Sequence, residues 1–159
     1  MSMENKNFKK GTTTVGIKCV DGIVMAADKR VLYVEDEKFF ADTVDTVLTG
    51  AGYSVKLAAD GEEGIKVARE WKPDLILLDL LLPKIEGFEV LKQLKADLST
   101  KAIPIIVFSN LSSEGDVKKA TDLGALHFFV KAMTMPSVIL TTVKEVIGLP
   151  PATALSTPH

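Results

Sequence analysis

The residues of this chain whose types could do chemistry stand at the ends of short apolar runs. Asp79 closes the run 75–78, and the pair Glu35 and Asp36 closes the run 31–34. A carboxylate at the end of a buried strand is costly unless something uses it. Three such carboxylates repel one another, and a divalent cation that prefers oxygen ligands relieves this repulsion. We therefore expect them to form a cation site.

A hydroxyl and an ammonium close two further apolar runs. Ser109 follows the run 105–108, and Lys131 follows the run 126–130. In a parallel sheet the carboxyl ends of the strands lie on one edge. The three acids, the Ser109 hydroxyl and the Lys131 ammonium should therefore converge there.

The elements that position these groups follow from the hydrophobic pattern. From residue 31 onward, short apolar runs alternate with segments of helical period, which is typical of a βαβ succession. Right-handed crossovers are expected throughout. The predicted strands are 31–34, 54–58, 75–79, 105–108 and 126–130. The predicted helices are one from residue 40 that ends at Gly50 or Gly52, 61–71, 87–97, one that Ser112 or Ser113 caps and that runs to residue 123, and 136–147.

Composition limits the class of protein. With 159 residues and 47% hydrophobic content, the chain can bury one full core. The single cysteine, Cys19, excludes an internal disulfide, and no run reaches the roughly 18 apolar residues of a spanning helix. Residues 1–10 show no secretory signal. We expect a cytoplasmic protein with no membrane partner.

The net charge of -2 is unevenly distributed. Residues 1–30 carry six Lys/Arg against three Asp/Glu, and the remainder carries thirteen against eighteen. Six spread charges without interleaved aromatic residues are typical of a solvated segment, so we expect no direct nucleic-acid binding.

The two ends of the chain differ from its middle. The β-prone runs 12–18 and 23–27 flank an Asp-Gly turn signal, which predicts a β-hairpin. The run 23–28 also ends in an acid and competes for the place of first strand, but the acid pair favours 31–34. The last residues, 149–159, contain three prolines and no periodicity, which predicts a disordered tail.

Residues 30–148 closely resemble the receiver domain of two-component response regulators. The resemblance rests on Glu35-Asp36, on Asp79 with Pro83 and Gly87 at D-x-x-x-P-x-x-x-G, and on the residues that close the fourth and fifth strands, Ser109 and Lys131. It implies an α/β fold with a doubly wound five-stranded parallel sheet in the order 2-1-3-4-5. Helices should cover both faces, as in flavodoxin.

The resemblance also implies roles for these residues. Asp79 would accept a phosphoryl group, and Lys131 would pair with a phosphoryl oxygen. Asp36 and Asp79 would hold Mg²⁺ directly, Glu35 directly or through water, and the backbone carbonyl of Leu81 would complete the set.

Two further residues would form the switch. After phosphorylation the Ser109 hydroxyl would donate to the acyl phosphate and draw its loop inward. Phe128 would fill the vacated space, and its lack of a hydroxyl predicts weak gating.

The function expected from the resemblance is that of a stand-alone receiver. A histidine kinase or phosphotransfer protein would phosphorylate Asp79, and slow self-dephosphorylation would follow. The signal would pass to a downstream protein effector across the fourth helix, fifth strand and fifth helix, and this face or the hairpin could also form a homodimer. The alternative is a pseudo-receiver or engineered scaffold in which phosphorylation plays no part.

The start of the chain is similar to another family. Residues 10–16, with Gly11-Thr12, and residues 21–30 resemble the opening of an archaeal-type proteasome β subunit, in which Thr12 would be an N-terminal nucleophile. Because the catalytic lysine of that family has no counterpart here, we expect no hydrolase activity. The pattern favours a chimera with an arm at 1–30, a receiver at 31–148 and a tail at 149–159.

Overall fold

The computed structural model describes residues 28–151 of the chain. The expected hairpin, the Thr12 segment and residues 152–159 of the expected tail lie outside this range.

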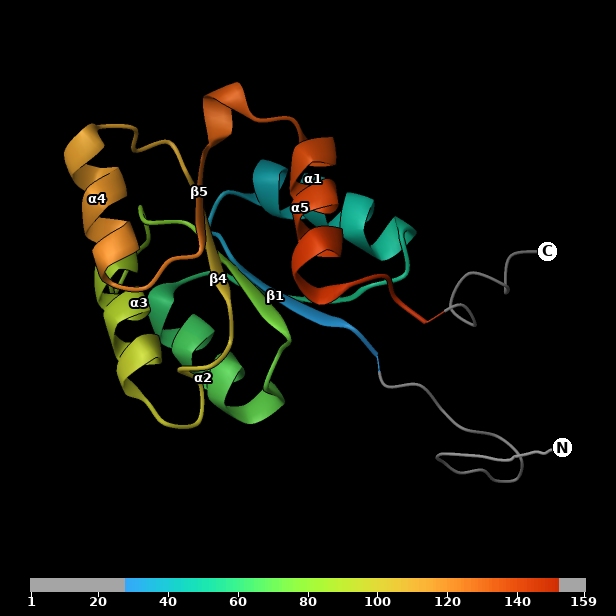
Figure 1. Cartoon of the computed structure of the whole chain (residues 1–159), viewed down its shortest axis with the longest axis horizontal. Helices are drawn as coiled ribbons and strands as arrows, with labels where there is room; N and C mark the ends of the chain where they lie inside the picture. Colours follow the sequence, from blue (N-terminus) through green and yellow to red (C-terminus); the bar gives the residue numbers. More distant parts are fainter. Residues whose placement is uncertain (1–27, 152–159) are drawn as a thin grey trace, which may run out of the picture.

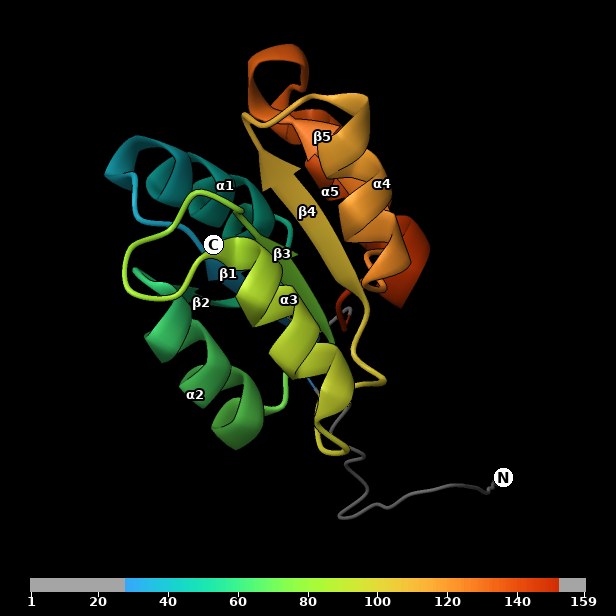
Figure 2. The same ribbon diagram turned by 90° about the vertical axis from the view of Figure 1, so that its left-hand side faces the viewer.

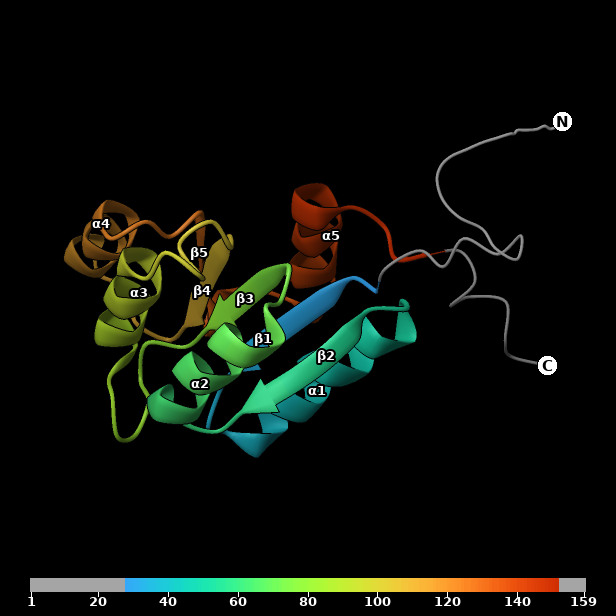
Figure 3. The same ribbon diagram turned by 90° about the horizontal axis from the view of Figure 1, so that it is seen from below.

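The core of the fold is one parallel sheet of five strands. The strands are β1 (Arg30–Val34), β2 (Ser54–Ala58), β3 (Leu75–Leu78), β4 (Ile105–Ser109) and β5 (His127–Val130). Their order is β2-β1-β3-β4-β5, which can be followed in Figure 3. The predicted strand order is confirmed.

Helices cover both faces of the sheet. They are α1 (Lys38–Gly50), α2 (Gly61–Trp71), α3 (Gly87–Ala96), α4 (Glu114–Asp122) and α5 (Pro136–Ile147), with a 3-10 turn, η1 (Lys131–Met133), after β5. Figure 1 shows α1 and α5 on one side of the sheet, and Figure 2 shows α2, α3 and α4 in front of the other. The doubly wound arrangement is confirmed.

The central strands are apolar because both of their faces are covered. Every residue of β3 is fully buried, as are the four residues of β1 that follow Arg30. One face packs on Ile65, Ala68 and Leu91 of α2 and α3, and the other on Val44 and Ile139 of α1 and α5. This rigid centre holds the ends of β1 and β3, where the predicted carboxylates stand.

Side-chain caps fix where two helices begin. Asp60 accepts a hydrogen bond from the Glu63 N–H at 2.8 Å at the start of α2. Ser113, one of two predicted caps for α4, accepts one from the Asp116 N–H at 3.0 Å. Each cap satisfies a backbone donor that the first helical turn leaves unpaired.

The loop between β3 and α3 depends on a glycine. A Cβ atom at Gly87 would lie 2.3 Å from the Cα of Leu80 and 2.5 Å from the carbonyl oxygen of Asp79. The Gly87 N–H also donates to the Leu80 carbonyl at 3.0 Å. Backbone therefore packs on backbone directly behind Asp79, which only glycine allows.

Gly87→Ala should lower the free energy of unfolding by about 2 kcal/mol or more, because the new methyl group meets backbone that cannot move cheaply. Gly50→Ala is the matched control, since a Cβ at this helical position meets nothing within 4 Å. The control should stabilise the protein by about 0.5–1 kcal/mol. Urea denaturation of both variants checks this, and equal effects would contradict the close packing at Gly87.

Candidate functional site

Three carboxylates meet at the carboxyl edge of the sheet. Glu35 and Asp36 follow β1, Asp79 follows β3, and these strands are direct neighbours. One oxygen atom from each carboxylate lies within 4.8 Å of the other two. Glu35 and Asp79 are only 3% and 2% exposed, whereas Asp36 is exposed. The cluster is thus buried on one side and open to solvent on the other.

The Lys131 ammonium lies among these acids. Its Nζ atom is 2.5 Å from Glu35 Oε1, 3.0 Å from Asp79 Oδ2 and 3.7 Å from Glu37 Oε1. Lys131 Nζ also lies over the face of the Phe40 ring, 4.5 Å from its centroid, in a cation–π contact. Because Lys131 is itself buried, it must keep an anionic partner.

Neutral donors complete the bonding of the two buried carboxylates. Glu35 Oε1 accepts from the Tyr33 hydroxyl at 2.8 Å, and Oε2 accepts from the Glu37 N–H at 3.0 Å. Asp79 Oδ1 accepts from the Leu81 N–H at 3.1 Å. Every oxygen of the two buried carboxylates therefore has a donor, as a buried charge requires.

The environment shifts the pKa values of the Glu35–Lys131 pair. Burial raises the pKa of Glu35 above its ordinary 4.5, and the charge of Asp79 adds to this, although Lys131 opposes it. Burial lowers the pKa of Lys131, but its bonds to Glu35 and Asp79 outweigh burial, so the net pKa is raised. Two acids with one ammonium leave an excess of negative charge, which favours an added cation.

The predicted hydroxyl and aromatic residue lie on the neighbouring strands. Ser109 ends β4 and is fully buried, and its Oγ accepts from the Leu111 N–H at 3.4 Å. Within residues 28–151 the Ser109 hydroxyl has no hydrogen bond to the carboxylates. Phe128 of β5 is half-buried and packs on the face of the sheet that α2, α3 and α4 cover.

Three residues of the cluster were not predicted from the sequence. Tyr33 and Glu35 lie on the same side of β1 because strand residues alternate, and this two-residue spacing could have signalled their contact. Glu37 and Phe40 reach Lys131 from the start of α1, and no local pattern indicates that approach.

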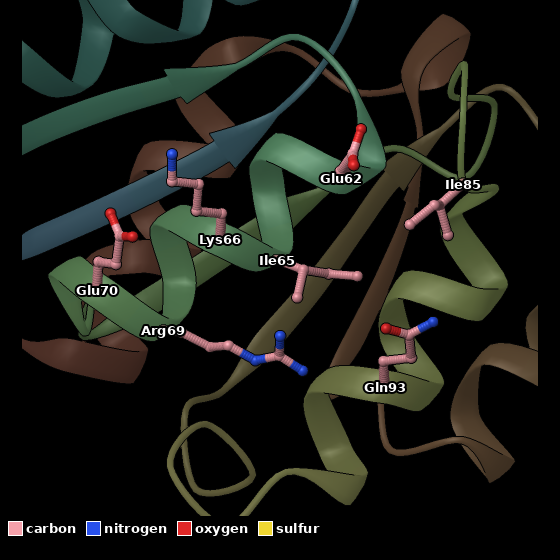
Figure 4. A pocket seen from close by; sticks show the side chains of 7 residues that line it. All are labelled: Glu62, Ile65, Lys66, Arg69, Glu70, Ile85 and Gln93. Atoms are coloured by element: carbon pink, nitrogen blue, oxygen red, sulfur yellow. The ribbon is translucent and has the colours of Figure 1, made fainter.

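A second feature, a groove between α2 and α3, is separate from this cluster. It has a volume of about 440 Å³, and its lining includes none of the three carboxylates. Figure 4 shows Ile65 and Arg69 pointing toward α3, whereas Lys66 and Glu70 point away from it. Arg69 is already paired with Asp97 at 2.7 Å. The groove lacks convergent reactive groups, so the carboxylate cluster is the candidate site.

The sequence profile of the response regulator receiver domain family matches residues 31–144. The chain belongs to the response regulator receiver domain family. This receiver domain covers most of the chain, and its bounds agree with the segment that carries the carboxylates and Lys131.

Relatives place the receiver domain among signalling proteins. It is 36% identical over 110 residues to the DNA-binding dual master transcriptional regulator RpaA of Synechocystis, covering 69% of this chain but only 46% of that protein. It is 32% identical over 120 residues to the polar-differentiation response regulator DivK of Brucella anthropi, covering 76% of this chain and 97% of that protein. The chain therefore spans about half of RpaA and nearly all of DivK.

A solved structure shares the architecture. The receiver domain of a sensor histidine kinase from Pseudomonas aeruginosa, with a magnesium ion coordinated in its active site cleft, is 25% identical with a TM-score of 0.70. The match covers 77% of this chain and 99% of that one. The homology to receiver domains of response regulators and histidine kinases is consistent with phosphorelay signalling.

In residues 28–151 of the receiver domain, none of the helices combines the length and the apolar character that a membrane crossing requires.

The raised pKa of Glu35 predicts a pH dependence of stability. The folded state binds more protons than the unfolded state, so wild type should lose stability relative to Glu35→Gln as pH rises above about 4.5 without divalent cations. Urea denaturation in a chelator measures this, with Glu114→Gln at the exposed start of α4 as the control. A wild type that gains stability over Glu35→Gln across this range would contradict the assignment.

Proposed function

We propose that the protein accepts a phosphoryl group on Asp79 and works as the receiver of a phosphorelay. The observation that carries this proposal is the position of the Asp79 carboxylate. It is 2% exposed, lies 3.0 Å from the Lys131 ammonium and has two further carboxylates beside it. Neighbouring carboxylates repel one another, so a purely structural role for Asp79 does not explain why two further acids lie beside it.

The donor set fits Mg²⁺. The cation prefers oxygen ligands, and the oxygens of Glu35, Asp36 and Asp79 lie within 4.8 Å of one another. We assign Asp36 and Asp79 as direct ligands, Glu35 as a ligand directly or through water, and the Leu81 carbonyl as a further one. When bound, Mg²⁺ neutralises charge on the phosphoryl oxygens.

The side chains then divide the work of phosphoryl transfer. A carboxylate oxygen of Asp79 attacks phosphorus, and the bond from phosphorus to the donor's leaving group breaks with its electron pair going to that group. Lys131 moves from the carboxylates to a phosphoryl oxygen, where it forms a charge-assisted hydrogen bond. Ser109 donates its hydroxyl to another phosphoryl oxygen, and Phe128 turns inward behind it as the second part of the switch. Water later hydrolyses the acyl phosphate slowly.

The surface around the site suits a protein donor. Phe39, Met133 and Met135 are 74%, 83% and 69% exposed, and they belong to the segments that follow β1 and β5. Exposed apolar side chains on the segments that also carry the charged residues of the site offer a docking surface for a histidine kinase or a phosphotransfer protein.

The output would leave by a different face. We propose that a downstream effector, or a second copy of the chain, binds across α4, β5 and α5. Ala120 is the one fully buried residue of α4. A helix held by so few contacts can move when Ser109 does.

The rest of the domain arrangement is also part of this proposal. Residues 31–148 are the receiver, residues 1–30 are an added arm that resembles a proteasome β subunit in sequence, and residues 149–159 are a tail. The alternative, a scaffold without phosphorylation, keeps the same fold and leaves the acids unused.

Phosphorylation from a small phosphodonor separates these alternatives. Incubation with acetyl phosphate and Mg²⁺ should add one phosphoryl group to wild type and none to Asp79→Asn, as intact-mass spectrometry measures. Asp122→Asn, an exposed acid on α4, is the control and should label like wild type. Equal labelling of wild type and Asp79→Asn would reject the proposal.

Mg²⁺ should also stabilise the fold by mass action. At ten times its dissociation constant the gain is about 1.4 kcal/mol, or about 5 °C in melting temperature. Asp36→Asn should abolish most of this shift, whereas Asp122→Asn should retain it. An unchanged melting temperature for wild type in excess Mg²⁺ would show that the metal site is misplaced.

A further inference from the structure

Tyr33 is a buried tyrosine in the middle of the sheet. It lies in β1 between Leu57 of β2 and Leu77 of β3, and its exposed fraction is zero. A phenol hydroxyl in such a place needs an acceptor, because burial without one is costly. The neighbouring residues of β1 are aliphatic and offer no side-chain acceptor. The hydroxyl must therefore find its acceptor at the end of the strand.

The acceptor is Glu35. The Tyr33 hydroxyl donates to Glu35 Oε1 at 2.8 Å, and Lys131 Nζ approaches the same oxygen at 2.5 Å. Burial, and then the charge of Glu35, raise the pKa of Tyr33 above its ordinary value of 10.0, so the hydroxyl stays a donor. Glu35 Oε1 therefore has one charged donor and one neutral donor.

Aromatic packing holds both donors in place. The Tyr33 ring lies 6.3 Å from the Phe108 ring, and Phe108 meets Phe40 edge to face at 6.3 Å. Phe40 in turn lies under Lys131 Nζ. The tyrosine is thus packed from the side and cannot turn its hydroxyl away from Glu35 without disturbing this cluster.

We propose that Tyr33 is a positioning residue that keeps Glu35 ready to help bind the cation while Lys131 is drawn away. This inference rests on the proposed function. When the carboxylates hold a divalent cation, it repels Lys131 from Glu35 toward Glu37, whose Oε1 atom lies 3.7 Å from Nζ, and after transfer Lys131 turns to the phosphoryl group. Glu35 Oε1 then keeps the Tyr33 hydroxyl as its donor and is not left buried and unpaired.

Removal of the hydroxyl should therefore cost cation binding. Tyr33→Phe should destabilise the cation-bound state in particular. In that state Lys131 has moved away from Glu35 Oε1, so loss of the hydroxyl leaves this oxygen without a donor. The dissociation constant of Mg²⁺ should rise about tenfold, the size expected for one hydrogen bond to a charged group. Phosphorylation by acetyl phosphate should slow by the same factor at limiting Mg²⁺ and recover to within about twofold at saturating Mg²⁺.

The chain offers a matched control in its other tyrosine. Tyr53 is 3% exposed, and its hydroxyl donates to the Gly148 carbonyl at 2.6 Å. It directly precedes β2, at the amino edge of the sheet and opposite the carboxylates. Tyr53→Phe loses a buried hydrogen bond of the same kind and should leave the Mg²⁺ dissociation constant unchanged.

The experiment is calorimetric titration of Mg²⁺ into wild type, Tyr33→Phe and Tyr53→Phe, with the full chain. A second measurement needs no variant: the Cζ resonance of Tyr33 in ¹³C-tyrosine-labelled wild type should shift during the Mg²⁺ titration, and that of Tyr53 should not. Equal dissociation constants for the two variants, or a Tyr33 resonance that ignores Mg²⁺, would overturn the inference. A wild type that binds no Mg²⁺ would instead overturn the proposed function.

Discussion

The structure depends on the burial of two carboxylates with a single ammonium between them. Glu35, Asp79 and Lys131 are each at most 5% exposed, and Lys131 contacts both acids. The pair interaction offsets part of the cost of removing these charges from water, but one negative charge remains in excess. The exposed carboxylate of Asp36 adds a second. The negative charge of the site is therefore only partly neutralised. An added cation or a movement of Lys131 would change the electrostatic potential at the site strongly.

The fold brings these charges together through the geometry of parallel strands. Because β1 and β3 are neighbours and run in the same direction, the residues that follow them share one edge. Lys131 arrives from the more distant β5 through the turn η1, and the Phe40 ring on α1 supports it. Behind Asp79, close packing of Gly87 on the backbone fixes the loop. The site is therefore built from both a rigid sheet and a tightly packed loop.

Much of this arrangement could be predicted because it is encoded locally. Apolar runs that end in Asp79, Ser109 and Lys131 marked the strands, and helical periodicity marked the helices between them. The predicted bounds of α2 and α5 agree with the structure, whereas α1 begins two residues earlier than its apolar face suggests and β5 one residue later. Terminal turns carry little periodicity, so such errors are expected.

The contacts that could not be predicted are those that depend on side-chain direction across elements. The approach of Glu37 and Phe40 to Lys131 requires the orientation of α1 on the sheet, which no spacing reveals. The contact of the Tyr33 hydroxyl with Glu35 is a different case, because it is local and its two-residue spacing could have signalled it, although the strand reads as an ordinary apolar run. Conversely, Ser109 was correctly placed at the end of β4, but its hydroxyl contacts the Leu111 N–H.

A crystal structure of the protein with Mg²⁺ and trifluoroberyllate, a mimic of the phosphoryl group, would test the role of the carboxylate cluster most directly. We expect the mimic on an Asp79 oxygen, the cation on the carboxylates of Asp36 and Asp79, and Lys131 Nζ beside a fluorine atom. A cation bound elsewhere, or Lys131 still shared between Glu35 and Asp79 beside an unmodified carboxylate, would contradict that role.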